Sequence, residues 1–454
     1  MRWRSYARRG SGGGGRPCGG ALARSGVNLR ILLVSEDIPH PLLGGLGKHV
    51  LALARELHHR GHEVDLLGNA DHSVADLPTQ AGPGRFIAGI RGHQRLFKEK
   101  QLGVFLPWRA DWNARAVREA ILRHSGGYDV VHYHGHLPWL AANLPLSLPF
   151  TQTRHDQGGD CILNTRYANP PPADFSPCRA LDASACAGCA TAHPGAVRRA
   201  VSAAAVRGLR KRTAAAYDAH PVVFVSEFLR QGFARVAGGI ERGEVVHNGV
   251  SVTALAEAVA APALPRGAEI EVFTAGAVTP YKGFVAVVEA LRKSPLRPGT
   301  RLTIAGDGPD MPRLRALAAG LPVRLLGWIS HAEVLRQTRS ADFVLVPSLW
   351  EEPFGGTTLE ALALGRTVLA LRRGGTPELA KYAGPGANRL KLFDSLPELL
   401  AGLYRSHELP VSELPEQSLQ LFRGSIATMT DALELHYGHV RARAGAEWAG
   451  PSRA

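Results

Sequence analysis

Two carboxylates in the segment 350–361, WEEPFGGTTLEA, are placed to bind a polar ligand. Glu352 comes before the pair Gly355 and Gly356, and Glu360 follows in what we expect to be the first turns of a helix. Glycines let the backbone approach a ligand closely, and the unpaired N–H groups of a helix N-terminus suit a phosphate. Carboxylates accept hydrogen bonds from sugar hydroxyls. As residue types alone, the segment predicts either a phosphate- and sugar-binding site or an exposed acidic turn.

A second group of reactive side chains consists of four cysteines within 29 residues, spaced C-x16-C-x7-C-x2-C. Two thiolates in a C-x2-C pair can hold one tetrahedral metal ion. The residues around them are typical of a loop, so a structural metal would supply order that a core does not. We expect structural zinc here, with unligated thiols or an iron–sulfur cluster as alternatives. The four candidate ligands are Cys161, Cys178, Cys186 and Cys189.

Length and composition indicate two soluble domains. The 454 residues are 45% hydrophobic and 20% charged, and no apolar run is long enough to span a membrane. The net charge is +14, but residues 1–30 contain seven arginines and no acid, which leaves 14 − 7 = +7 for the remainder. We expect residues 1–27 to form a disordered basic head. No aromatic or groove-reading motif accompanies the arginines, so we expect no nucleic-acid partner.

Alternating strand and helix patterns must position these groups. In the first half we expect strands at 29–35, 63–67, 129–132, 150–153 and 222–225, with a glycine-rich turn at 44–48 and an amphipathic helix after it. The second half repeats the alternation, with strands at 271–274, 302–305, 323–326, 343–346 and 367–371 and helices such as 284–291 and 311–318. This alternation predicts an α/β protein with two Rossmann-like parallel-sheet domains.

The expected domain layout follows from these elements. A first domain covers 28–253 and contains a cysteine insert at 157–197. The alanine- and proline-rich stretch 254–267 is expected to be a linker, and 268–440 the second domain. Residues 441–454 are expected to be a disordered tail. A basic stretch at 198–212 predicts a solvated helix face or, alternatively, a peripheral contact with anionic lipid.

Several motifs in order resemble the retaining glycosyltransferases of family 4. The glutamates of EEPFGGTTLEALALG have the E-x7-E spacing of that family, and the resemblance extends over roughly residues 29–430. It implies the GT-B fold, in which two Rossmann-like domains face each other across a cleft. The other motifs are GGLGKH at 44–49, DVVHYHGHLPW at 129–139, VVFVS at 222–226, HNGV at 247–250, TPYKGF at 279–284, AGDGP at 305–309 and GGTPEL at 374–379.

The resemblance also implies a role for each matching residue. Glu360 would bind the ribose of the donor nucleotide, Glu352 the transferred sugar, and Lys282 the diphosphate. His134 would lie near the reacting centre of the donor sugar, although His132 and His136 compete for this role. The backbone positions expected to approach the donor are Gly355, Gly356 and Thr357 in the second domain, and Gly45 and Gly47 in the first.

One position departs from the family. An arginine that usually follows the glycine after the first strand of the second domain is replaced here by Ala277. A charge-assisted contact of this kind is worth roughly 1.5–3 kcal/mol. Arg372 or Arg373 could replace it; otherwise the donor differs or the enzyme is weak.

The implied reaction moves a sugar from a nucleotide-sugar co-substrate to a hydroxyl acceptor with retention of configuration. The acceptor would be a glycan, a lipid-linked glycan or a small molecule. The family implies no catalytic metal, and we expect a cytoplasmic enzyme with at most peripheral membrane contact. The alternatives are another GT-B enzyme, such as an epimerase or a phosphorylase, or a non-enzymatic module that binds zinc or binds nucleic acid through the basic head.

Overall fold

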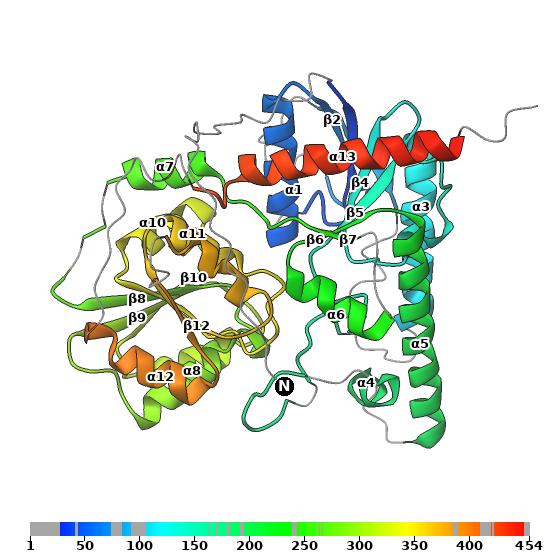
Figure 1. Cartoon of the computed structure of the whole chain (residues 1–454). Helices are drawn as coiled ribbons and strands as arrows, with labels where there is room; N and C mark the ends of the chain where they lie inside the picture. The colour runs from blue at the N-terminus through cyan, green and yellow to red at the C-terminus, as the bar shows by residue number, and fades with distance from the viewer. Residues whose placement is uncertain are drawn as a thin grey trace, which may run out of the picture.

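The computed structural model shows two α/β halves side by side, joined by long connections and by the last helix (Figure 1). The basic head expected at 1–27 lies outside the described residues. None of the described helices is both long and apolar enough to cross a membrane. The structure describes residues 28–40, 44–73, 84–91, 106–161, 163–168, 171–178, 182–190, 195–237, 243–262, 264–265, 267–384, 389–408, 419 and 422–448.

The first half is built on a seven-stranded parallel sheet with the order β3-β2-β1-β4-β5-β6-β7. Its central strands β1 and β4 are buried along almost their whole length, because both faces of the sheet are covered. The strands are β1 Arg30–Val34, β2 Glu63–Asn69, β3 Phe86–Ile90, β4 Val130–His134, β5 Phe150–Arg154, β6 Val222–Phe224 and β7 Gly243–Val245. The helices are α1 Gly45–His59, α3 Leu106–His124, α4 Ala183–Ala190, α5 Ala196–Ala219 and α6 Glu227–Ala237, with a short 3-10 helix η3 at Leu140–Asn143.

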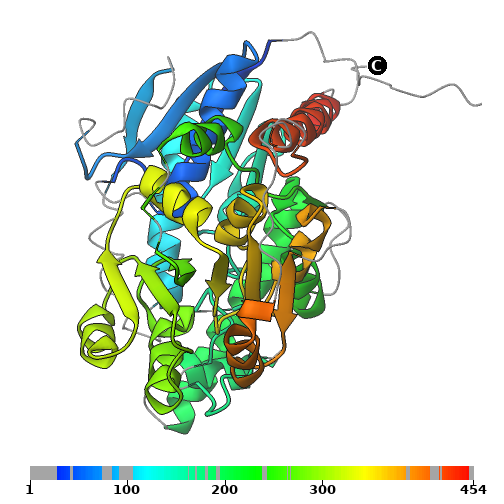
Figure 2. The same ribbon diagram turned by 90° about the vertical axis from the view of Figure 1, so that its left-hand side faces the viewer.

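The second half has a six-stranded parallel sheet with the order β10-β9-β8-β11-β12-β13. Figure 2 looks onto this half and shows helices on either side of its strands. The strands are β8 Ile270–Ala275, β9 Thr300–Ala305, β10 Val323–Gly327, β11 Phe343–Val346, β12 Thr367–Leu371 and β13 Leu390–Phe393. The helices of this half are α7 Val252–Ala260, α8 Phe284–Lys293, α9 Met311–Ala318, α10 His331–Ser340, α11 Gly356–Ala363 and α12 Leu396–Tyr404, with 3-10 helices η4 Pro280–Lys282, η5 Thr376–Tyr382 and η6 Ser406–Glu408. The last helix, α13 Ile426–Trp448, follows them in the chain.

The expected α/β class is confirmed. Each expected strand has its counterpart, whereas β3, β7 and β13 were not anticipated. The stretch expected as a linker begins inside α7, because Leu255 and Ala258 are buried and the helix packs against α10. The expected tail is helical as far as Trp448.

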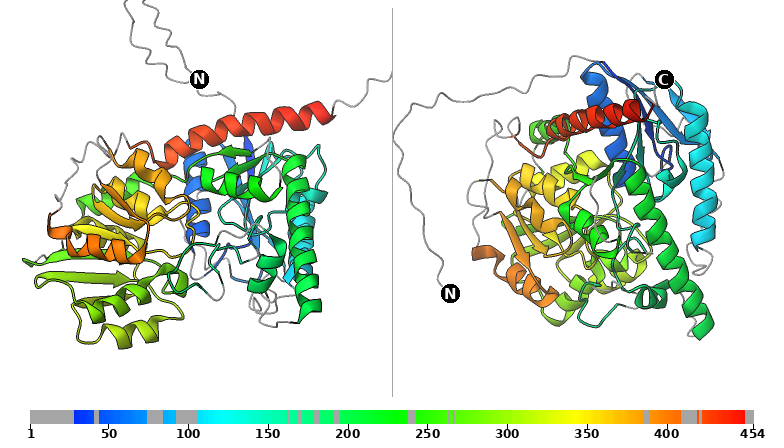
Figure 3. Two further views of the ribbon diagram at one scale, coloured as in Figure 1. Left: turned by 60° about the horizontal axis from the view of Figure 1, so that its bottom comes forward. Right: turned by 45° about the vertical axis from the view of Figure 1, so that its right-hand side comes forward.

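Helix α13 returns from the second half to the first, as Figure 3 shows. Arg60 at the end of α1 donates to Asp431, with 2.6 Å between Nη1 and Oδ1. The hydroxyl of Tyr437, which is fully buried, lies 2.7 Å from Nδ1 of His132 in β4. The last helix therefore packs on the first sheet, and the expected second domain at 268–440 did not anticipate this crossing.

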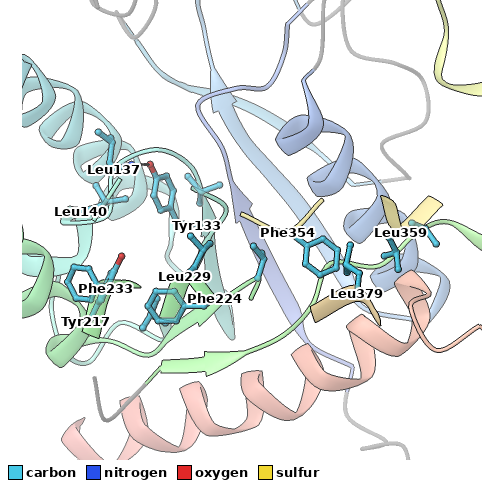
Figure 4. Packing of buried hydrophobic residues seen from close by; sticks show 14 of the residues in the cluster. Tyr133, Leu137, Leu140, Tyr217, Phe224, Leu229, Phe233, Phe354, Leu359 and Leu379 are labelled. Atoms are coloured by element: carbon cyan, nitrogen blue, oxygen red, sulfur yellow. Dashed lines mark hydrogen bonds between the residues drawn. The ribbon is translucent and has the colours of Figure 1, made fainter. Parts of the chain in front are cut away.

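The largest hydrophobic cluster contains residues of both halves. Its first-half members include Phe224 and Leu229, and its second-half members include Phe354 and Leu379. Figure 4 shows Phe354 beside Leu379. Phe354 belongs to the segment that carries the two candidate glutamates. Apolar packing between the halves therefore supports the loop on which the candidate site depends.

Candidate active site

Lys282 and Glu352 form an ion pair in the second half, with 2.6 Å between Nζ and Oε1. They follow β8 and β11, the neighbouring central strands where the strand order reverses and where open α/β sheets bind ligands. Ser348 donates to the same oxygen at 2.6 Å, and the Lys282 ammonium lies 4.8 Å from the ring centre of Trp350. Burial raises the pKa of Glu352, but Lys282 and the hydrogen bonds outweigh it, so the pKa lies below its usual value. Glu352 is therefore an ionised, buried carboxylate held beside a cation.

Backbone contacts hold these two residues in place. The carbonyl of Tyr281 accepts from the amides of Leu349 and Trp350, which ties the Lys282 turn to the loop after β11. The Gly375 amide donates to the Glu352 carbonyl at 2.8 Å. Gly374 has φ +55°, and a Cβ there would lie 2.0 Å from the Glu352 carbonyl oxygen. Only glycine fits at position 374 without moving Glu352.

The N-terminus of α11 follows Glu352 directly and has no side-chain cap. Gly355 is the N-cap residue with φ +94°, Gly356 is exposed and starts the helix, and Thr357 is half-buried. The hydroxyls of Thr358 and Thr376 are close to Gly355, and within the described residues these buried groups make no hydrogen bond. Uncapped N–H groups beside two hydroxyl donors suit the binding of an anion such as phosphate.

Glu360 lies one turn into α11, where its Oε1 is 2.7 Å from Nε2 of His331 at the start of α10. Its side chain is about one-fifth exposed, against 8% for that of Glu352. The two glutamates thus face different surroundings. Glu352 is paired with a lysine in the interior, whereas Glu360 and its histidine lie nearer the surface.

The first half contributes a second uncapped helix N-terminus. Gly44 precedes α1 in extended conformation without a side-chain cap, and a Cβ at Gly45 would meet nothing within 4 Å. Gly47 is buried within the first turn. These glycines follow β1, which neighbours β4 at the reversal point of the first sheet.

Three histidines gather at the ends of these strands. Nδ1 of His134, the last residue of β4, is 3.1 Å from Nε2 of His155, which follows β5. His49 of α1 completes the group, whose ligand atoms lie within 4.8 Å of one another. Burial lowers the pKa of His49 to about 4 and holds the pKa values of His134 and His155 well below the usual value. All three imidazoles are therefore neutral near pH 7.

The neighbouring histidines have other partners. His132 is fully buried, and its ring nitrogens lie 2.7 Å from the hydroxyl of Tyr437 and 2.7 Å from that of Thr153. His136 lies between Asp156 at 2.7 Å and Asp37 at 3.1 Å. Burial lowers the pKa of His136, but the two carboxylates outweigh it and raise the pKa well above the usual value. Within the described residues, Nε2 of His134 is a buried ring nitrogen without a hydrogen-bond partner, which favours His134 among the three candidates.

Contacts between the halves bring the two carboxyl-terminal sheet edges together. The amide of Gln157, which follows β5, donates to the carbonyl of Glu351, beside Glu352. The hydroxyl of Ser226, after β6, donates to the Pro353 carbonyl at 2.6 Å. The segments with the candidate residues therefore meet at one interface.

The two arginines considered as substitutes for the missing cation are engaged elsewhere. Arg372 pairs with Asp394 at 2.7 Å, and Arg373 is buried and donates to the carbonyls of Asp394 and Phe175. Ala277 itself is exposed. The structure gives no support for either replacement.

The four cysteines are half-buried free thiols at one end of the first half. Among the described residues, the histidine group around His134 has metal-ligand spacing, whereas the sulfurs do not come equally close together.

Sequence reasoning missed His49, His155 and His331, and also Ser348 and the hydroxyl pair beside Gly355. His49 was within a quoted motif, GGLGKH, so its position after the glycine turn was an available signal. The contact between His331 and Glu360 joins α10 to α11 and depends on tertiary packing.

Two parallel sheets with facing carboxyl-terminal edges give the chain the GT-B architecture, and the family models that match it make it a glycosyltransferase. It belongs to glycosyltransferase family 4. The family model "Glycosyltransferase Family 4" matches residues 43–254, and the model "Glycosyl transferases group 1" matches residues 256–388.

Named relatives agree with this assignment. The chain is 27% identical over 380 residues to the glycogen synthase of Mycobacterium tuberculosis, with 77% of this chain and 80% of the relative covered. It is 26% identical over 378 residues to a phosphatidyl-myo-inositol mannosyltransferase of the same species, with 80% and 84% covered. Among solved structures, Anabaena HepE in complex with UDP and glucose superposes with a TM-score of 0.57 at 16% identity, with 91% of this chain and 100% of that chain covered.

Proposed function

We propose that this enzyme transfers a glycosyl group from a nucleoside diphosphate sugar to a hydroxyl acceptor with retention of anomeric configuration. The observation that carries the proposal is the 2.6 Å pair of Lys282 and Glu352 beside the uncapped N-terminus of α11. A diphosphate needs cations and N–H donors, and a sugar needs a carboxylate for its hydroxyls. These groups lie together at the switch point of the second sheet.

The roles divide along the donor. Glu360 binds the ribose hydroxyls, with His331 fixing the carboxylate at 2.7 Å. The amides of Gly355, Gly356 and Thr357 contact the diphosphate with Lys282, and Glu352 binds hydroxyls of the transferred sugar. Gly45 and Gly47 approach the diphosphate from the first half, and the neutral His134 exchanges hydrogen bonds with the sugar near the reacting carbon.

In the reaction, the bond between the anomeric carbon and the diphosphate oxygen breaks while a bond to the acceptor oxygen forms on the same face. The acceptor proton passes to the departing diphosphate. Negative charge grows on the leaving group, and preorganised N–H donors with one ammonium stabilise it. We infer that transfer needs no resident metal, because Lys282 and the helix N–H groups do this electrostatic work.

The donor and acceptor are proposed by class. HepE was solved with UDP and glucose, which makes a UDP-sugar the first donor to test. The named relatives include a glycogen synthase and a phosphatidyl-myo-inositol mannosyltransferase, so a glycan and a lipid-linked molecule are the acceptor classes to test first. We place the acceptor on the first half, near His134 and His136.

A thermal-shift screen of the full chain against UDP, GDP, ADP and their sugars tests the proposal. A ligand that binds the native state raises its apparent stability by mass action. One nucleotide should stabilise the wild type and the Glu289→Gln control, whose carboxylate is at a distant surface pair with Arg313, but not Glu360→Gln. Failure of every nucleotide to stabilise the wild type at millimolar concentration would overturn the donor site. Transfer with inversion, detected by NMR of the product, would overturn retention.

A further inference from the structure

The cysteine insert (residues 157–197) brings four thiols into one neighbourhood. The Arg166 amide donates to the sulfur of Cys161 at 3.3 Å, and the Arg166 carbonyl accepts from the Cys178 amide at 3.2 Å. The backbone of Arg166 therefore links two cysteines that are 17 positions apart in the sequence.

The other two cysteines are joined to the same place by Arg210. Cys186 and Cys189 lie one turn apart on α4, which packs against α5. Nη2 of Arg210, on α5, is 3.3 Å from the Cys186 sulfur and 2.8 Å from the carbonyl of Asp160, the residue before Cys161. One guanidinium thus bridges the C-x2-C pair and the chain at the first cysteine.

We propose that the four cysteines of the insert bind one zinc ion, and that this ion holds the insert against the donor-binding half. Zinc with four thiolates carries a net charge of −2, because four protons leave when the metal binds. Arg166 and Arg210 are both buried at this place and provide positive charge and N–H donors to sulfur. Asp160 also lies here, and Arg166 pairs with it at 2.9 Å through Nε.

Among the described residues, the part of the insert that contains Cys186 and Cys189 has only a small core, which is why a metal would matter there. The cluster that joins α4 to α5 consists of Ala183, Ala187, Ala203 and Val206, with Cys186 packed beside it. Three alanines and one valine bury little apolar area, so this cluster contributes little to holding the segment. Zinc–sulfur bonds of about 2.3 Å place the sulfurs roughly 3.8 Å apart. No three of the four sulfurs, all of which belong to described residues, lie within 4.8 Å of one another in the structure, so zinc binding requires these cysteines to move closer together.

The insert also reaches the donor-binding half, so its order affects the site. Tyr167 and Phe175 pack against the hydrophobic cluster of the second half, and the Tyr167 ring lies 6.4 Å from that of Tyr281. Gln157 donates to the Glu351 carbonyl. Tyr281 and Glu351 directly precede Lys282 and Glu352 in the sequence. The zinc site stands without the proposed transfer reaction, and only its effect on donor binding rests on it.

Metal analysis of the full chain, purified without a metal-affinity tag, tests the zinc site. Mass spectrometry of metals should find about one zinc per chain in the wild type and in Cys18→Ser, the control for the fifth cysteine. The double variant Cys186→Ser/Cys189→Ser should lose the zinc. If this variant does not fold, a mercurial reagent added to the native wild type should release one zinc as four thiols react.

Three results would overturn the assignment: an iron stoichiometry in place of zinc, two disulfides in the intact mass under non-reducing conditions, or four reactive thiols without metal. The link to the donor site has its own measurement. On zinc release, hydrogen exchange should rise in peptides of the insert and in those containing Tyr281 and Glu351, and the KM for the donor should rise several-fold. Zinc release without faster exchange around Tyr281 would refute that link, whereas an absence of any transfer activity would leave the metal result intact.

Discussion

Replacing Lys282 with methionine should damage both stability and catalysis, for separable reasons. Methionine keeps an unbranched stem against Trp350 but leaves the buried carboxylate of Glu352 without its cation. Removing one partner of a fully buried ion pair costs about 3–5 kcal/mol. The Lys282 side chain is 23% exposed and Ser348 still donates to the carboxylate, so we expect a loss of about 2–3 kcal/mol in the free energy of unfolding. Lys293→Met, at an exposed position at the end of α8, is the matched control.

The expected effect on catalysis follows from the lost contact between the Lys282 ammonium and the diphosphate leaving group. Loss of a charge-assisted contact of about 1.5–3 kcal/mol lowers kcat/KM by about 10- to 150-fold. The double variant Lys282→Met/Glu352→Gln neutralises the stranded charge and keeps a hydrogen-bonding group for Ser348. It should recover about 1–2 kcal/mol of stability. Its kcat/KM should stay at or below that of the single variant, because the cation is still missing.

The pH dependence of unfolding provides a further check. In the wild type the pKa of Glu352 is lowered, so its contribution to stability is present above the unfolded pKa and is lost as the pH falls through the folded value. In Lys282→Met the effect of burial on Glu352 dominates, so the pKa of Glu352 rises. The loss in the free energy of unfolding relative to the wild type should therefore be largest near pH 7 and vanish at low pH. Denaturant unfolding from pH 3 to pH 8 measures this difference. A constant deficit across that range, or a double variant that regains kcat/KM, would refute the reasoning.

Three further predictions concern other residues. His136→Gln should be less stable than the wild type by about 1–3 kcal/mol. Because the pKa of His136 is raised in the folded state, this loss of stability should reach its full size below the pKa of the unfolded state. It should disappear as the pH rises through the folded pKa, which unfolding titrations at different pH values measure. His134→Ala should lower kcat/KM at least tenfold with a small change in melting temperature. His132→Ala should mainly lower the melting temperature, because Tyr437 and Thr153 lose their hydrogen-bond partner. Equal losses of melting temperature in the two variants would contradict this division. Gly374→Ala should cost more stability than Gly320→Ala, because both positions have positive φ but only at Gly374 would the added Cβ clash with a carbonyl oxygen. Calorimetry should show weaker donor binding for Gly374→Ala alone. Equal losses of stability in the two variants would refute the role of that contact.

The sequence was informative where local patterns decide structure. Continuous apolar runs such as 343–346 identify buried parallel strands, and Glu352 was expected in the segment that follows this strand. That β8 and β11 are neighbours in the sheet, which brings Lys282 to Glu352, is known only from the structure. The strands β3, β7 and β13, which were missed, are all edge strands and are largely half-buried, so they lack the buried run that identifies a central strand.

Long-range contacts were beyond local patterns. The hydrogen bond between His132 and Tyr437 joins residues 305 positions apart, and nothing in either neighbourhood indicates the other. The gathering of His49, His134 and His155 likewise requires knowing that β1, β4 and β5 are neighbours in that order. The choice of His134 over His132 and His136 rests on the hydrogen-bond partners of each ring, which only a three-dimensional structure provides.

The return of α13 has a consequence for how the protein is made. Strand β1 and helix α13 pack in the same half, so the second half is an insertion within the first in the order of synthesis. Domains generally fold as units, starting from the N-terminus as the chain emerges from the ribosome. Here Arg60 and His132 of the first-made half lack their α13 partners, Asp431 and Tyr437, until the last part of the chain has been synthesised. A ribosome that stops shortly before residue 426 would therefore release a chain in which the earlier half is incomplete and the later half has its full sheet.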